Sequence, residues 1–428
     1  MRRYESYKDS GVDWLEDVPA HWEVKKMKFL FKDTSIKNKP DETLLSVTQN
    51  RGVIPRDWLE ERTVMPSGNL ETFKFIQKDD FAISLRSFEG GLEICHHDGI
   101  ISPAYTVLKY NKKLLNNGYY KYLFKCQKFI SEMQTSIVGI REGKNISYEE
   151  LKYSFLPIPQ TIEQQKIAQF LDDKTAKIDQ AVDLAEKQIA LLKEHKQILI
   201  QNAVTRGLNP DVPLKDSGVE WIGQVPEHWS VKKIKHVTSK IGSGITPLGG
   251  GSNYIDGGIP LLRSQNIHFD RIDLNDVARI SEFTHNSMKN SKVRKGDVLL
   301  NITGGSLGRC FYVDSNEEMN VNQHVCIIRP NKKINTIFLN MLLASEIGQK
   351  QIWFFQQGGG REGLNFQAIK NFYLPLPDLE EQQKIAIYLD KQAAKIDQAI
   401  TLKTAHIEKL KEYKSVLIND AVTGKVRV

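Results

Sequence analysis

The alternation of apolar and polar residues predicts two long amphipathic helices, at residues 161–205 and 379–423. In both stretches, apolar residues recur at alternating spacings of three and four, with Glu, Lys and Gln between them. The stretches share EQQKIA, KIDQA and AVT at one constant offset, which indicates a duplication. This spacing places the apolar side chains on one helical face and predicts a coiled-coil seam. The predicted seam positions are Leu171, Ile178, Val182, Ile189, Leu192, Leu199, Leu389, Ile396, Ile400, Ile407, Leu410 and Leu417.

Both predicted helices begin at a capping signal. Thr161 with Gln164, and Asp378 with Glu381, fit the capping box, in which two side chains satisfy free backbone N–H groups. About 45 residues, each rising about 1.5 Å, give a rod of about 65 Å. Since a seam of this length exceeds what one small domain covers, we expect the two helices to pack on each other. The alternative is that each helix packs on its own domain.

The chain before each helix is also duplicated. Residues 9–28 have the sequence DSGVDWLEDVPAHWEVKKMK, and residues 216–235 have DSGVEWIGQVPEHWSVKKIK. Between this box and the helix the halves diverge, but both contain short alternating apolar runs broken by Gly, Asn, Asp and Pro, which indicate strands with long loops. We predict two tandem α/β (mixed α+β) globular domains, each followed by a long helix. The predicted bounds are 1–158 for the first domain, 159–207 for its helix, 208–376 for the second domain and 377–428 for its helix.

Connectivity predicts the direction of the helices. The first helix leaves the first domain and delivers the chain to the second domain. If the helices pair over their length, the second must run back, so we expect an antiparallel coiled coil with the domains related by a pseudo-two-fold axis. Such an arrangement would meet a DNA duplex at two separate places, as dyadic binders do.

Composition narrows the class of protein only modestly. The content is 40% hydrophobic and 26% charged, as in ordinary soluble proteins. No apolar run approaches the length of a membrane span, and MRRYESYKDSG has no signal-peptide core. The four cysteines form no CxxC pair, so a reduced, cytoplasmic location is expected. The net charge of +7 favours an acidic partner such as nucleic acid.

No catalytic motif stands out in the sequence. We find no GxxxxGK[ST] loop, no dinucleotide-binding GxGxxG and no Asn/Asp-Pro-Pro-aromatic tetrapeptide of the kind that holds a flipped base in amino-methyltransferases. The Gly-rich residues 242–253 and 303–308 lack the Lys/Ser-Thr ending and following helix of a phosphate-binding loop. We therefore expect no catalytic residue, no metal site and no cofactor bound by this chain.

The order and the amino-acid sequences of these segments resemble those of the specificity subunit of type I restriction–modification enzymes, the HsdS family. The resemblance covers nearly the whole chain. It rests on the two DSGVxWxxxVPxHWxVKK boxes, SPAYTVL, REGKN and REGLN, the LPIP and LPLP turns, and the two EQQKIAxxLD…KIDQA helices.

This resemblance implies a non-catalytic DNA-binding subunit with two target recognition domains and an antiparallel helical spacer. It implies two methyltransferase (M) subunits that carry S-adenosylmethionine and methylate adenine at N6. It also implies restriction (R) subunits that use ATP and Mg to cleave unmodified DNA. Since the loops of the two domains differ, we expect a bipartite, asymmetric target whose gap is set by the length of the rod.

Loop residues that can pair with base edges are the candidates for reading DNA. Arg pairs with guanine and Asn or Gln with adenine in the major groove. For each candidate, contact with phosphate alone or with nothing is an equal alternative. Arg141 and Arg361 recur in both halves, so we assign them to the DNA backbone or to a structural loop. The other candidates are Gln49, Asn50, Arg51, Ser84, Arg86, Ser87, Thr246, Arg263, Gln265, Asn266, Asn301, Thr303, Arg309, Asn322 and Gln323.

Two identical M subunits need two equivalent surfaces, which the repeated EQQKIA segments could supply. We therefore predict partner contacts at Gln164, Gln165, Gln382 and Gln383, with a solvated first helical turn as the alternative. Three other functions are considered: a stand-alone DNA-binding scaffold or regulator, an enzyme with an unrecognised motif, and a coiled-coil dimerisation protein that does not bind DNA.

Overall fold

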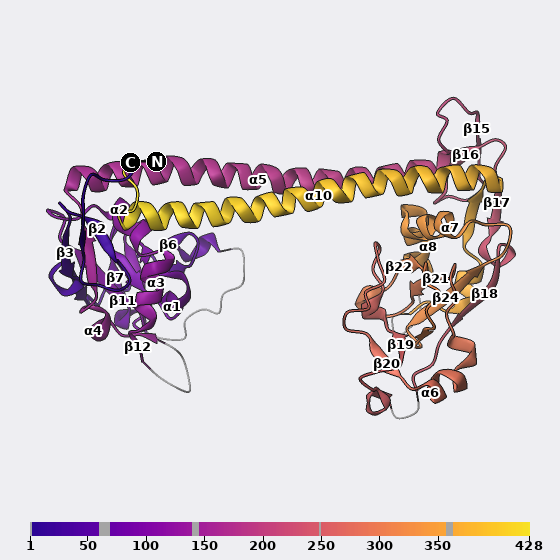
Figure 1. Ribbon diagram of the computed structural model, residues 1–428, viewed down its shortest axis with the longest axis horizontal. Helices are drawn as coiled ribbons and strands as arrows, with labels where there is room; N and C mark the ends of the chain where they lie inside the picture. Colours follow the sequence, from indigo (N-terminus) through magenta and orange to yellow (C-terminus); the bar gives the residue numbers. More distant parts are fainter. Residues whose placement is uncertain (1, 60–68, 139–144, 248–249, 357–362) are drawn as a thin grey trace. The chain divides into compact units, whose positions relative to one another are not determined.

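The computed structural model describes residues 2–59, 69–138, 145–247, 250–356 and 363–428. The chain forms two compact units. Unit 1 contains Met1–Glu186 and Thr404–Val428, and unit 2 contains Lys187–Lys403. Each unit is a mixed α/β structure that includes parts of both long helices (Figure 1). The domain and helix bounds predicted from the sequence stay a prediction.

The helices and strands of unit 1 are short except for α5. They are β1 (Tyr7–Asp9), β2 (Asp17–Pro19), β3 (Glu23–Lys26), β4 (Phe31–Thr34), β5 (Leu45–Thr48), β6 (Gly52–Pro55), β7 (Lys74–Ile76), β8 (Phe81–Ile83), α1 (Ser87–Gly90), β9 (Glu93–Ile94), β10 (Gly99–Ile101), β11 (Thr106–Tyr110), α2 (Asn117–Leu123), α3 (Gln127–Gln134), β12 (Ile137–Val138), β13 (Asn145–Ile146), α4 (Tyr148–Leu151), β14 (Phe155–Ile158) and α5 (Thr161–Arg206), which continues into unit 2.

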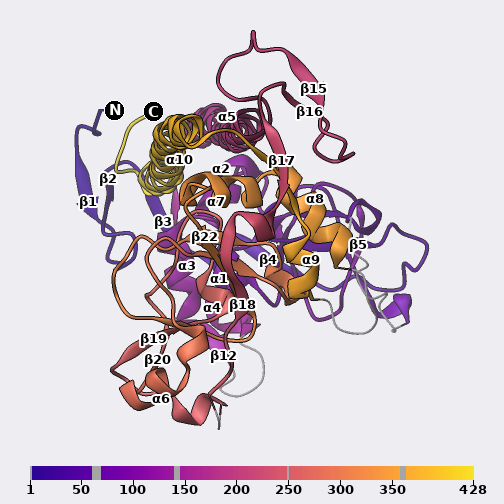
Figure 2. The same cartoon turned by 90° about the vertical axis from the view of Figure 1, so that its right-hand side faces the viewer.

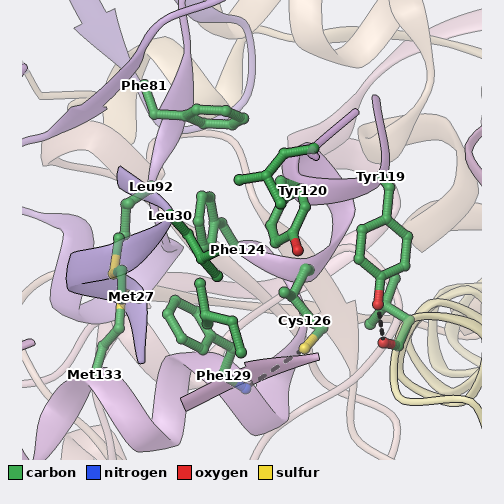
Figure 3. Packing of buried hydrophobic residues seen from close by; sticks show 14 of the residues in the cluster. Met27, Leu30, Phe81, Leu92, Tyr119, Tyr120, Phe124, Cys126, Phe129 and Met133 are labelled. Carbon is green, nitrogen blue, oxygen red and sulfur yellow. Dashed lines mark hydrogen bonds between the residues drawn. The ribbon is translucent and has the colours of Figure 1, made fainter. Parts of the chain in front are cut away.

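The main sheet of unit 1 is antiparallel, with the strand order β4-β11-β8-β9. A core dominated by aromatic residues lies between this sheet and the helices α2 and α3. Phe81, Phe124 and Phe129 are fully buried, and their rings meet edge-on or tilted (Figure 3). Such ring pairs add to the stabilisation that comes from burying their area. The hydroxyl of Tyr119 donates a hydrogen bond to the Val422 carbonyl at 2.6 Å, which ties α10 to this core.

Unit 2 repeats the plan of unit 1 with longer strands. Its elements are β15 (Leu214–Asp216), β16 (Gln224–Pro226), β17 (Ser230–Lys233), β18 (Thr238–Ser243), β19 (Ile259–Leu262), β20 (Ala278–Ile280), α6 (Glu282–Ser287), β21 (Val298–Asn301), β22 (Cys310–Tyr312), β23 (Asn320–Val321), β24 (Val325–Pro330), α7 (Thr336–Ala344), α8 (Glu346–Phe355), α9 (Phe366–Lys370), β25 (Tyr373–Leu376) and α10 (Leu379–Val422), which continues into unit 1.

The same sheet order recurs in unit 2. Its four-stranded sheet runs β18-β24-β21-β22, the counterpart of β4-β11-β8-β9. In both units, the last strand of the repeated box pairs antiparallel with the strand that precedes the long helix, as β3 with β14 and as β17 with β25. The predicted mixed α/β class is confirmed.

The two long helices predicted from the heptad pattern are present. α5 spans 46 residues and α10 spans 44. Within each unit, the portions of α5 and α10 that belong to it lie side by side (Figures 1 and 2). The first residues of each helix are buried in the core of the domain before it, Leu171 in unit 1 and Leu389 in unit 2. Each helix therefore begins by packing on its own domain, as the alternative prediction had it.

Polar bridges join the helices further along. In unit 2, Lys403 donates to Gln188 at 2.6 Å, and Lys196 pairs with Asp397 at 2.7 Å, so α5 and α10 run in opposite directions there. Lys196 is a charged residue within the otherwise apolar seam, and Asp397 is its ion-pair partner. Exposed ion pairs of this kind contribute little stability, so their main effect is on the register of the two helices.

The same bridge occurs in unit 1 with the roles of the helices exchanged. Lys414 of α10 pairs with Asp179 of α5 at 2.7 Å. Lys414 is the repeat counterpart of Lys196, and Asp179 is the counterpart of Asp397. Residues at equivalent positions therefore form equivalent bridges in both units.

The predicted capping boxes are only partly correct. Asp378 accepts a hydrogen bond from the Glu381 N–H at 2.8 Å, as expected of a cap. Thr161, however, is the first residue of α5 itself, and the Gln164 side chain bonds to residues outside the helix. The capping box predicted for Thr161 and Gln164 is therefore wrong, because tertiary hydrogen bonds satisfy the Gln164 side chain instead.

Candidate functional site

Exposed loops of unit 2 bring several predicted DNA-reading residues together. Thr246, after β18, hydrogen-bonds to the side chain of Gln323, which lies just before β24. The Gln323 amide lies 3.1 Å from one ring nitrogen of His324, and the Thr303 hydroxyl lies 2.6 Å from the other. Thr246 and Gln323 are exposed, and His324 and Thr303 are half-buried. This group of hydroxyl, amide and imidazole offers the donors and acceptors that base edges require.

Sequence reasoning missed His324. A single histidine beside Gln323 carries no motif, and only its contacts with Thr303 and Gln323 distinguish it. The one available signal was its position next to two predicted candidates. We define Thr246, Thr303, Gln323 and His324 as the unit 2 loop cluster.

Three other candidates of unit 2 have a structural role instead. Asn266, Asn301 and Asn322 are buried. The Asn266 side chain accepts from the Arg263 N–H and donates to the Asp273 carbonyl, both at 3.0 Å. A buried amide is retained where it satisfies local backbone groups, as these do. The prediction that these three asparagines contact DNA is corrected, because their side chains are buried and hydrogen-bond to backbone groups of unit 2.

Hydrogen bonds to the backbone also account for the other two asparagines. Asn301 donates to the Ser264 carbonyl at 2.7 Å, and Asn322 accepts from the His324 N–H at 3.0 Å. Asn322 thereby holds the backbone of the loop that carries the exposed Gln323.

Three candidates of unit 2 lie outside this network. Gln265 is exposed, whereas Arg263 and Arg309 are half-buried. The Arg263 guanidinium lies 5.7 Å from the centre of the Tyr254 ring, within the range of a cation–π contact. These three remain predicted DNA contacts.

In unit 1, the hairpin turn between β5 and β6 carries Gln49, Asn50 and Arg51, all exposed. This turn lies against α1, since a Cβ added to Gly90 would lie 3.2 Å from Cγ of Gln49. The exposed Arg86 immediately precedes α1. The fold therefore places two of the predicted loops next to each other.

Ser84 and Ser87 hydrogen-bond to each other at the start of α1. The buried Ser87 hydroxyl accepts from the Ser84 N–H at 2.9 Å and shapes the entry to α1. Its burial corrects the prediction that Ser87 contacts DNA, whereas the half-buried Ser84 stays a candidate. Arg141 and Arg361 lie outside the described residues.

The glutamines predicted to contact a partner divide into two pairs. Gln164 and Gln382 are fully buried. The Gln164 side chain accepts from the Asn116 N–H at 2.7 Å and donates to the Pro159 carbonyl at 2.8 Å. Gln382 bonds to Asn335 and Pro377 in the same way. These two glutamines anchor the helices to their domains, and their burial corrects the predicted partner contact.

Gln165 and Gln383 are exposed and remain predicted partner contacts. Gln383 also accepts a hydrogen bond from the Asn335 side chain at 2.6 Å.

A histidine of each repeated box also anchors a helix. His21 lies 2.9 Å from Glu163, and His228 lies 2.9 Å from Glu381. Glu163 additionally accepts from the Tyr4 hydroxyl at 2.6 Å. Burial and the Glu163 charge raise the pKa of Tyr4, so this phenol stays protonated and remains a donor. The repeated histidines are thus structural, and the sequence signal was their recurrence together with the Glu of each EQQKIA segment.

Metal and thiol chemistry find little support in this fold. Among the described residues, no group of three or more His, Cys, Asp or Glu side chains could bind a metal ion. All four cysteines are buried and unpaired. Burial raises the pKa of each thiol to about 12, so none is present as a reactive thiolate near neutral pH. No helix among the described residues is long and apolar enough to cross a membrane.

Comparison with known proteins points to one family. Residues 226–412 match the family model described as the type I restriction modification DNA specificity domain. The MjaVIII specificity subunit of Methanocaldococcus jannaschii is 28% identical over 77% of this chain and 75% of its own length. The EcoBI specificity subunit of Escherichia coli is 26% identical over 86% of this chain and 77% of its own length.

The fold is shared as well. A chain solved in a study of complex assembly and conformational transition of the type I R-M system aligns with a TM-score of 0.69 at 14% identity, over 96% of this chain and 99% of that one. These findings give no support to a stand-alone scaffold. The chain is therefore similar to the specificity subunits of type I restriction enzymes, and residues 226–412 match the DNA specificity domain of that family.

Proposed function

We propose that this specificity subunit binds a bipartite, asymmetric DNA target, with one unit contacting each half. The observation that carries the proposal is a repeated frame with different loops. Both units have the same sheet order and the same helix anchors, but unlike side chains at their exposed loops. Because bases are read by side chains and the frame only positions them, unlike loops suit unlike half-sites. The exposed or half-buried candidates are Gln49, Asn50, Arg51, Ser84 and Arg86 in unit 1, and Thr246, Arg263, Gln265, Thr303, Arg309, Gln323 and His324 in unit 2.

We further propose that α5 and α10 form one antiparallel coiled coil that sets the gap between the half-sites. The two lysine–aspartate bridges support this, because they use equivalent residues with the helices exchanged. That exchange is the pattern a pseudo-two-fold axis across the coiled coil would produce.

In this proposal the chain itself is non-catalytic. Two M subunits that carry S-adenosylmethionine dock on the repeated surfaces and methylate adenine, with Gln165 and Gln383 among the contacts. R subunits, which use ATP and Mg, join the same complex to cleave unmodified DNA. The family resemblance supplies these partners, and the exposure of the two glutamines is compatible with docking.

Mapping adenine methylation across the genome tests this function directly. Long-read sequencing of cells that express the chain with its cognate M subunit is expected to reveal a gapped, two-part methylated motif. The motif is expected to vanish when the gene for this chain is deleted. A continuous motif, or an unchanged motif after deletion, would contradict the proposal that this chain selects a bipartite target.

Lengthening the coiled coil is expected to lengthen the gap. We suggest inserting seven residues between Glu186 and Lys187 and seven between Lys403 and Thr404, which keeps the heptad seam in register. The rise of about 1.5 Å per residue adds about 10 Å, equivalent to about three base pairs. The methylated motif should keep both halves and gain about three unread positions. An insertion in one helix alone is the control, and it should abolish methylation because the seams no longer match. An unchanged gap after the double insertion would refute the proposal that the length of the coiled coil sets the gap.

A further inference from the structure

A cavity of about 200 Å³ lies in unit 2 where α7 and β22 face the first part of α10. Its walls include the stacked rings of Phe311 and Tyr312, whose centres are 4.7 Å apart, and the side chain of Met341. Asn340 of α7 and Asp390 of α10 supply polar groups, and most of the remaining lining is apolar. The other charged residues of the lining already have partners, because Lys196 pairs with Asp397 and Asp270 pairs with Arg271.

The side chains of Asn340 and Asp390 both lack a hydrogen-bond donor among the described residues. Asn340 is only 4% exposed, and its Oδ1 atom is buried without a hydrogen-bond partner. Asp390 forms no ion pair or hydrogen bond with the described residues of the chain. Asp390 lines the same cavity as Tyr312, and the pKa of Tyr312 is raised by burial and, to a smaller extent, by the charge of Asp390. A buried acceptor without a partner is unfavourable, so a ligand with donors would be stabilised here.

The corresponding place in unit 1 has an internal cation. Asn116 caps α2 and Asn335 caps α7, which aligns Lys121 with Asn340 and Tyr122 with Met341. Matching Gln164 with Gln382 in the same way aligns Asp172 with Asp390.

In unit 1 the carboxylate has donors within the chain. Asp172 accepts from Lys121 at 2.6 Å and from the Tyr122 hydroxyl at 2.7 Å, and Tyr122 also reaches Thr175 at 3.1 Å. In unit 2 the counterparts of these donors are Asn, Met and Ala, which are shorter or cannot donate to the carboxylate. The cavity of unit 2 therefore occupies the place where unit 1 has a lysine and a tyrosine.

We propose that this cavity receives an arginine side chain of the M subunit that docks at unit 2. The proposal rests on the proposed function for the identity of the partner. A guanidinium is a permanent cation with five donors in a plane, so it can pair with Asp390 and donate to Asn340 Oδ1 together. It also stacks on aromatic faces such as those of Phe311 and Tyr312, which the strongly hydrated ammonium of lysine does less well.

One consequence is that the two docking sites for M are inequivalent. At unit 1 the carboxylate is neutralised by Lys121 of the chain itself, whereas at unit 2 the partner supplies the cation. The copy of M at unit 2 has an anchor that the copy at unit 1 lacks.

The cavity can be tested without any partner by NMR of the full chain labelled at its methionine methyl groups. The probe is N-acetyl-L-arginine amide, and the Met341 signal is assigned with a Met341→Leu variant. A saturable shift of this signal with a midpoint at about millimolar concentration is expected. The uncharged analogue N-acetyl-L-citrulline amide should shift it at least about 10-fold less strongly.

Two variants make this result specific. Asn340→Lys gives unit 2 the internal cation of unit 1 and should abolish the shift. Asp390→Asn alters only an exposed helical side chain, so the fold is retained, and it should weaken binding about 10-fold. No shift at about 50 mM arginine amide, or equal shifts with citrulline amide or in Asp390→Asn, would overturn the proposal.

The assembled complex tests the partner. Native mass spectrometry on dilution should show that Asp390→Asn loses one M subunit at about 10-fold higher concentration than the unaltered chain. Lys121→Gln is the matched control in unit 1 and should not weaken the copy of M at unit 2. Unchanged dissociation of Asp390→Asn would refute the anchor, even if the arginine amide binds. If the unaltered chain binds no M subunit, the proposed function fails, and the amide titration still decides whether the cavity binds arginine.

Discussion

Replacing residues 29–140 with the same segment of a family member that has another target is expected to change one half of the methylated motif and leave the other half unchanged. This segment contains the β4-β11-β8-β9 sheet, the Gln49–Arg51 turn and the α1 loop. The β3–β14 pair and α5, which join the domain to the rest of the chain, stay native. The donor segment should retain an Asn at position 116, because its side chain caps α2 by accepting a hydrogen bond from the Tyr119 N–H at 3.2 Å.

Long-read mapping of adenine methylation gives the readout for this exchange. The matched control is the exchange of residues 236–360, which should change the opposite half of the motif. If either exchange altered both halves, or if both exchanges altered the same half, the assignment of one half-site to each unit would be wrong.

Asp297→Ala is expected to destabilise unit 2 more than substitutions of exposed residues do. Asp297 is fully buried and binds Arg329 of β24 through both carboxylate oxygens, at 2.7 and 2.8 Å. It also accepts from the Arg294 N–H at 2.8 Å. Removing one member of a buried pair leaves the other charge without compensation, which costs about 3–5 kcal/mol.

The measurement is urea unfolding of the full chain, with the transition of unit 2 followed separately because a protein with two units need not unfold in one step. Asp314→Ala is the control, since it removes a carboxylate that pairs with Lys295 at 3.1 Å while both side chains are exposed. That variant should leave the midpoint almost unchanged. Equal effects of the two substitutions would show that burial of Asp297 is not what matters.

The long helices and the duplicated plan could be predicted because both depend on local patterns. The heptad spacing and the repeated boxes can be recognised directly in the sequence. The heptad spacing also predicts that the apolar residues of each helix lie on one face. The contacts of individual polar residues depend on distant parts of the chain. Gln164 was predicted to cap its helix and contact a partner, but it bonds to the backbone of Asn116, far away in sequence.

The DNA candidates have the same limit. Asn301 and Gln323 are both amides in segments that were predicted to read DNA, and residue type alone does not separate the buried Asn301, which ends β21, from the exposed Gln323. His324 has no motif, so only its geometry with Thr303 identifies it. Asn340 offered a weak signal, as a polar residue inside the apolar helix TIFLNMLLA. Its meaning needed the structural alignment with Lys121, because the offset between α2 and α7 differs by one residue from the offset between α5 and α10.

Unit 1 is built from two separate parts of the chain, Met1–Glu186 and Thr404–Val428, and this affects how it folds during synthesis on the ribosome. Leu417, Ala421 and Val422 are buried in the core formed by residues of Met1–Glu186, and the Arg427 N–H bonds to the Arg2 carbonyl at 2.9 Å. Unit 2 is one uninterrupted stretch, Lys187–Lys403, and all of it is translated before Thr404. Domains in general fold as units during translation, the earlier one first. Here the order is reversed. Synthesis of unit 1 begins first, but its core is completed only after Thr404–Val428 has been translated, which is after all of unit 2. Until then, part of the apolar surface of unit 1 is exposed to solvent and accessible to chaperones.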